Sequence, residues 1–134
     1  MEGTETTVTF EPATLKAGSR NEVYMTIIVS SKEPGQQFYW CESEISVNHP
    51  LTLSPDSDMR KAKTRVGILK PGGTITKKLK IFTRPNNLPD SYGVSVTTYL
   101  YGEDGTIAER KESKVEILAV DNREDKAQNH IEKR

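Results

Sequence analysis

Residues 66–101, VGILKPGGTITKKLKIFTRPNNLPDSYGVSVTTYLY, decide the fold of this chain. Apolar and polar residues alternate on both sides of a turn in which Pro71 presets φ and Gly72 permits positive φ. The Pro-rich stretch 84–91 then separates these two runs from a third, which begins at Tyr92. Alternation with period two is the pattern of β-strands, so this region predicts three successive strands.

The same alternation extends outward in both directions, whereas helical periodicity is nearly absent. Asp104-Gly105, which follows the third strand, is one of the strongest hairpin signals, and it places Gly105 in the turn. The first of the three strands extends back to Lys61, and further strands are predicted at 7–10, 23–29, 38–47 and 107–120. Turn residues at near-regular spacing between about seven to eight strands predict an all-β, antiparallel β-sandwich with two sheets.

Parity along each strand predicts which side chains face the core. On the strand before Pro71, we expect Ile68 to face inward with Val66, while the basic residues at alternate positions face solvent. On the strand after it, Lys77 falls on the inward parity. Either a β-bulge shifts the register there, or the Lys77 side chain snorkels out at the sheet edge.

The turns and strands together resemble those of immunoglobulin-like modules of the fibronectin type III-like and CARDB-like kinds. The resemblance rests on LKPGGTITKKLKI (69–81), LPDSYGVSVTTY (88–99) and FEPATLKAGSRNEVYMTIIV (10–29). It implies an immunoglobulin-like β-sandwich, with Tyr92 as the tyrosine corner that bonds back to nearby backbone. It also implies non-catalytic binding or spacer roles, often on cell-surface or envelope proteins, and no fixed set of site residues.

Two departures from antibody-type domains stand out. Cys41 is the only cysteine, so the inter-sheet disulfide is missing. Trp40 lies on the expected third strand, where many such folds keep a core tryptophan, but its parity is opposite to that of Ile45 and Val47. Either a bulge in this strand or an exposed Trp40 resolves the conflict.

The predicted domain spans 6–120, after a flexible N-terminus at 1–5. Eight of the 14 residues in 121–134 are charged, which predicts a disordered tail. No segment approaches the roughly 20 apolar residues of a membrane span. The start of the chain does not resemble a signal peptide, so the chain as written is expected in the cytoplasm. An excised domain of a longer protein would instead be extracytoplasmic, since one cysteine fits either compartment.

The zero net charge conceals a strong asymmetry along the chain. Residues 59–89 contain nine basic residues and no acidic one, so the remaining segments carry ten basic and 19 acidic residues. Five of the basic residues share outward parity on the two strands that Pro71-Gly72 joins, which predicts one cationic face: Lys61, Lys63, Arg65, Lys78 and Lys80. Such a face could bind an anionic polymer or an acidic protein, or could simply be a solvated face that discourages edge pairing.

Phe38, Tyr39 and Trp40 form a second candidate site. Three successive aromatic residues cannot all face the core of one strand, so at least one is expected on the surface. An exposed ring could stack on a carbohydrate or anchor a protein partner. Alternatively, one ring caps the core and the others cover the sheet rim.

No arrangement typical of catalysis or of a cofactor is found. Asp56 and Asp58 are too few ligands for calcium, and His49 and His130 with a single cysteine give no zinc spacing. Cys41 is expected to be a small buried residue rather than a nucleophile. The sequence therefore predicts a non-enzymatic module that binds a protein partner, or alternatively one that binds carbohydrate or a polyanion. It predicts no metal or cofactor and leaves the partner's identity and the oligomeric state open.

Overall fold

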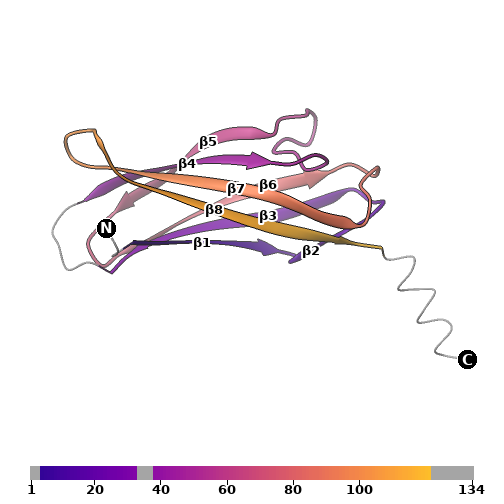
Figure 1. Cartoon of the computed structure of the whole chain (residues 1–134), viewed down its shortest axis with the longest axis horizontal. Helices are drawn as coiled ribbons and strands as arrows, with labels where there is room; N and C mark the ends of the chain where they lie inside the picture. The colour runs from indigo at the N-terminus through magenta and orange to yellow at the C-terminus, as the bar shows by residue number, and fades with distance from the viewer. Residues whose placement is uncertain (1–3, 33–37, 122–134) are drawn as a thin grey trace, which may run out of the picture.

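The computed structural model describes residues 4–32 and 38–121, which form eight β-strands and no helix (Figure 1). The strands are β1 (Thr4–Glu11), β2 (Thr14–Lys16), β3 (Asn21–Ser31), β4 (Tyr39–Val47), β5 (Lys61–Leu69), β6 (Thr74–Thr83), β7 (Asp90–Tyr101) and β8 (Ile107–Val120). Among the described residues, no helix could cross a membrane. β1 begins at Thr4, two residues before the predicted start of the domain. Of the predicted tail at 121–134, residues 122–134 lie outside the described residues.

The strands form two sheets, which confirms the predicted all-β sandwich. One sheet has three strands in the order β1-β3-β6, and the other has five in the order β2-β8-β7-β4-β5. All pairings are antiparallel except that of β2 with β8. Figure 1 shows the strands running along the length of the molecule, with the β7–β8 hairpin at the same end as the start of β4.

The core lies between the two sheets and is supplied by alternate residues, as the parity of the sequence predicts. On β3, Val23, Met25, Ile27 and Val29 are completely buried. They pack against residues of the five-stranded sheet such as Ile45. Deleting most of a buried side chain of this kind costs about 2–5 kcal/mol, so this row holds the sheets together.

Tyr92 forms the predicted tyrosine corner. Its hydroxyl donates a hydrogen bond to the backbone carbonyl of Leu88, four residues upstream. The neighbouring Asn87 is buried and ties the same corner to the turn after β2. Its side-chain Oδ1 accepts from Gly18 N at 3.0 Å, and its Nδ2 donates to Lys16 O at 3.3 Å. The corner is therefore fixed from both sides.

Two glycine turns occupy the positions that the sequence predicts. Gly72 has φ of 68°, and Gly73 N donates to Lys70 O at 2.9 Å beside Pro71. In the β7–β8 hairpin, Gly105 has φ of 81°, a conformation that favours glycine. These turns differ in what they connect. The β7–β8 turn joins paired strands, whereas the turn at Gly72 takes the chain from one sheet to the other.

Candidate functional site

The five basic residues of the predicted cationic face lie on two different sheets. β5 is the edge of the five-stranded sheet and carries Lys61, Lys63 and Arg65, whereas β6 is the edge of the three-stranded sheet and carries Lys78 and Lys80. All five side chains are exposed, as predicted. The prediction of one continuous cationic face is nevertheless wrong, because the outer faces of two packed sheets point away from each other.

On the three-stranded sheet, the lysines surround Tyr24. Lys78 Nζ and Lys80 Nζ lie 5.7 and 5.5 Å from the centre of its ring. Lys80 also forms an ion pair with Glu22 at 2.6 Å, and the hydrogen bond from Lys80 to that carboxylate raises the pKa of Lys80. These cations are therefore engaged with partners on their own sheet.

Lys77 has the inward parity, and no bulge corrects it. The register of β3 with β6 is regular, with Ile27 opposite Lys77, and the Lys77 side chain is half-buried. Of the two explanations open from the sequence, the side chain snorkels at the edge strand. A charge on the inner side of an edge strand discourages pairing with another chain.

On the five-stranded sheet, two of the basic residues lie opposite acidic ones. Glu42 and Glu44 of β4 are the register partners of Arg65 and Lys63. The Arg65 guanidinium lies 5.0 Å from the centre of the Trp40 ring. This half of the basic segment is therefore part of a mixed surface of charged and aromatic residues.

The three consecutive aromatic residues divide between core and surface, as predicted. Tyr39 is buried, whereas Phe38 and Trp40 are 43% and 42% exposed. The alternation of β4 is unbroken, so the opposite parity of Trp40 is explained by an exposed tryptophan and not by a bulge in β4. The irregularity lies instead on β5, where Cys41 and Glu42 pair with Gly67 and Arg65 and leave Val66 as an extra residue.

This bulge reverses the side-chain parity at the end of β5. Ile68 is 55% exposed and Leu69 is buried, so the prediction that Ile68 faces inward is wrong. Gly67 makes the reversal possible, since its φ of 145° is rarely adopted by other residues. A glycine within an alternating run is the one signal in the sequence that indicates such a bulge.

The bulge completes an apolar row across four neighbouring strands. Trp40 is the register partner of Ile68 on β5 and of Tyr101 on β7, and Tyr101 is the partner of Ile107 on β8. Ile68 and Ile107 are each 55% exposed, while Tyr101 is half-buried. We call Ile68, Trp40, Tyr101 and Ile107 the apolar row. Only Trp40 of these four was a candidate from the sequence. The other three come to lie beside it through strand order and register, which the sequence does not specify.

A hollow of about 490 Å³ opens beside the apolar row, between β4 and the β7–β8 hairpin. Its lining combines two aromatic rings, two carboxylates and two glycines: Trp40, Tyr101, Glu42, Glu103, Gly102 and Gly105. We call it the ring–carboxylate hollow. No basic residue lines it.

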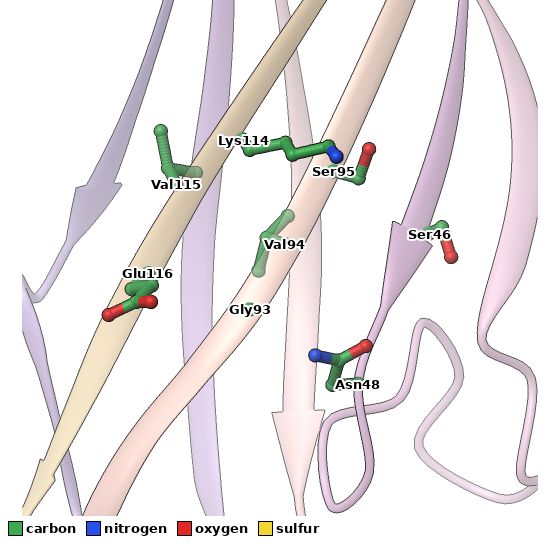
Figure 2. A pocket seen from close by; sticks show the side chains of 8 residues that line it. All are labelled: Ser46, Asn48, Gly93, Val94, Ser95, Lys114, Val115 and Glu116. Carbon is green, nitrogen blue, oxygen red and sulfur yellow. The ribbon is translucent and has the colours of Figure 1, made fainter.

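A second hollow, of about 370 Å³, lies toward the other end of the same sheet and is mainly polar (Figure 2). Gly93 lines this hollow and has no side chain to fill it. An added β-carbon there would come within 2.8 Å of Asn48 Nδ2. Ser46, Ser95 and Lys114 lie across three adjacent strands beside it. Without an aromatic ring in its lining, this hollow lacks the large apolar anchor that the apolar row provides.

Cys41 is completely buried, as predicted. Burial raises the pKa of its thiol to about 11, so the thiol stays protonated at neutral pH. Asp58, one of the two aspartates considered as calcium ligands, forms an ion pair with Arg60 at 2.9 Å. Within residues 4–32 and 38–121, no three His, Cys, Asp or Glu side chains gather as metal ligands would.

No protein-family model matches this chain, and no curated protein matches it. Solved structures with the same type of fold do match. The CARDB domain of a Pyrococcus furiosus protein is 14% identical, with 90% of this chain and 91% of that chain covered and a TM-score of 0.48. This domain is of the CARDB-like kind that the sequence resembled, and it is similar to the two-sheet β-sandwich of this chain.

Two further structures are similar to the same extent. The ApaA protein of Bordetella pertussis is 15% identical, with 87% of this chain and 91% of that chain covered and a TM-score of 0.49. The Bacillus subtilis sporulation control protein Spo0M is 20% identical over 89% of this chain, with a TM-score of 0.48. This chain spans 50% of the Spo0M chain. At these identities the likeness extends to the fold alone.

Proposed function

We propose that this domain is a non-catalytic interaction module that binds a protein partner through the outer face of its five-stranded sheet. The observation that carries the proposal is the apolar row, in which Ile68 and Trp40 are exposed neighbours and Tyr101 links Trp40 to the exposed Ile107. Neighbouring exposed apolar side chains, rimmed by charged ones, are a common mark of interaction sites.

The composition of this face also suits protein recognition. Tryptophan, tyrosine and arginine are enriched among the residues that dominate binding energy at interfaces. Trp40, Tyr101 and Arg65 lie together here, and Arg65 covers part of the Trp40 surface. Glu42 and Glu44 supply a polar border on the same strand.

The two alternatives have less support. A carbohydrate platform built from Phe38, Tyr39 and Trp40 loses its middle ring, because Tyr39 is buried. A polyanion site on the basic strands is divided between two sheets, and Lys80 is already paired with Glu22.

A peptide library displayed on phage and selected on the immobilised domain tests the proposal. Dissociation constants of enriched peptides would be measured for the wild type, for Trp40→Ala and for Tyr24→Ala. Tyr24 is the matched control, because it is 44% exposed on the outer face of the other sheet. We expect Trp40→Ala to weaken binding about tenfold or more, as loss of a central anchor does. Equal binding by wild type and Trp40→Ala, or no enriched peptide, would contradict the proposal.

A further inference from the structure

The ring–carboxylate hollow has the chemistry of a site for a positive charge. The faces of the Trp40 and Tyr101 rings carry partial negative charge and attract cations. Glu42 and Glu103 add two carboxylates to the same lining, and neither forms an ion pair within the described part of the chain. Rings and unpaired carboxylates that face one hollow leave a negative potential that a bound cation would neutralise.

The Trp40 ring already interacts with one cation from its own domain. Arg65 lies over it at 5.0 Å, but Arg65 does not line the hollow. Register places Tyr101 on the other side of Trp40 from β5, the strand that carries Arg65. The hollow therefore remains open toward Tyr101 and the β7–β8 hairpin.

The hairpin that borders the hollow is held in place by its own hydrogen bonds. Gly102 N donates to Thr106 O at 2.9 Å, and Gly105 N donates to Gly102 O at 3.0 Å. Asp104 Oδ1 accepts from Thr106 N at 3.1 Å and from Thr106 Oγ1 at 2.8 Å. These bonds to Thr106 lower the pKa of Asp104, which adds a lasting negative charge to the hairpin. Gly102 and Gly105 contribute no side chain that would fill the space.

We propose that the ring–carboxylate hollow binds a Lys or Arg side chain of the protein partner that docks on the apolar row. This inference rests on the proposed function of that row. The aliphatic part of the basic side chain would lie against Tyr101 and Trp40, and its charged end would meet Glu42 and Glu103. Charge complementarity selects this occupant, since the hollow is lined by acidic and aromatic residues only, apart from its glycines.

The test uses N-acetylarginine amide as the probe and N-acetylcitrulline amide as its uncharged analogue. Two-dimensional ¹H–¹⁵N NMR would follow the Gly102 and Gly105 amides and the Trp40 indole NH during each titration. We expect saturable shifts at these three groups with the arginine compound. The citrulline compound should bind about tenfold more weakly or worse, because it lacks the charge that cation–π and charge-assisted contacts require.

Variants separate this site from general electrostatic attraction. Glu42→Gln combined with Glu103→Gln should weaken arginine-compound binding about tenfold or more, because it removes both carboxylates from the hollow. Glu11→Gln combined with Glu116→Gln makes the same change in net charge outside the hollow and should leave binding within about twofold. Equal shifts with both probes, no localised shifts, or unchanged binding by the first double variant would overturn the proposal.

The same variants distinguish failure of this inference from failure of the proposed function. In one outcome, library-selected peptides bind Trp40→Ala more weakly than the wild type but bind Glu42→Gln/Glu103→Gln equally well. That result would support the apolar row as the binding site and contradict binding of a basic side chain in the hollow. Peptides that contain Lys or Arg and lose affinity on both variants would support both proposals.

Discussion

The guanidinium of Arg65 lies 5.0 Å from the centre of the Trp40 ring, across the β4–β5 pair. This contact orders two large side chains on an exposed face where neither is buried in the core. The β5 bulge allows it, because one extra residue separates Arg65 from Gly67 and lets Ile68 face outward beside the same ring. A local backbone irregularity therefore organises the surface that we propose as the binding face.

Replacing Arg65 should loosen the Trp40 ring. A cation–π contact at an exposed site contributes about 0.5–1 kcal/mol, so Arg65→Ala should lower the free energy of unfolding by about that amount. Urea denaturation followed by circular dichroism measures this change. Lys63→Ala is the control on the same strand and face and should have a smaller effect. Equal losses for the two variants would mean that the Arg65–Trp40 contact contributes nothing specific.

Removing the hydroxyl of Tyr92 should weaken the corner before β7. Its hydrogen bond to the Leu88 carbonyl is lost in Tyr92→Phe, with an expected cost of about 0.5–1.5 kcal/mol. Tyr99→Phe provides the comparison, because the Tyr99 hydroxyl has no hydrogen bond among the residues that the structure describes. Denaturation midpoints that fall equally for both variants would argue against a special role of the corner.

Substituting Gly67 should disturb both stability and the binding face. An alanine at φ of 145° is strained, so we expect Gly67→Ala to cost about 1–3 kcal/mol. Space alone does not limit this position, since the closest atoms to an added β-carbon are 3.7 Å away on Ile75. Chemical denaturation would measure the loss, and a neutral substitution would show that the bulge tolerates side chains.

The buried thiol of Cys41 should make stability depend on alkaline pH. Its pKa rises from 9.0 to about 11 in the folded protein, so the unfolded state loses this proton first. The contribution of this thiol to the free energy of unfolding is fully present below about pH 9. It is lost as the pH rises toward about 11, by at most ~1.4 kcal/mol per pH unit. Cys41→Ala removes this slope while leaving other titrating groups in place. Parallel stability–pH curves for wild type and Cys41→Ala would contradict the prediction.

Replacing Lys77 should expose β6 to edge pairing. Lys77→Val removes the charge from the inner side of an edge strand, and we expect the variant to self-associate more than the wild type. Lys78→Val is the matched control, because Lys78 is on the outward parity of the same strand. Sedimentation velocity over a concentration series measures the association. Identical behaviour of the two variants would indicate that Lys77 does not protect this edge.

Much of the fold follows from local features of the sequence. Period-two alternation indicates the strands, and the corner preceding Tyr92 and the glycine turn at Gly105 have clear local signatures. The turn at Gly72 has an equally clear signature, but the local chemistry of a turn does not say whether the next strand pairs with the previous one. The chain instead crosses between sheets there, which divides the basic residues between two faces.

The candidate site depends on register, which sequence parity describes only between irregularities. Parity correctly indicates that at least one of Phe38, Tyr39 and Trp40 is on the surface. It fails for Ile68 because a single extra residue reverses every side chain that follows in the strand. Tyr101 and Ile107 join the row only through pairing between strands.

The most direct test of the central claim is to map a library-selected peptide onto the ¹⁵N-labelled domain by NMR. We predict that the largest shifts fall on Ile68, Trp40, Tyr101 and Ile107. Shifts that instead cluster around Tyr24, Lys78 and Lys80, with the apolar row silent, would place binding on the other sheet and contradict the account.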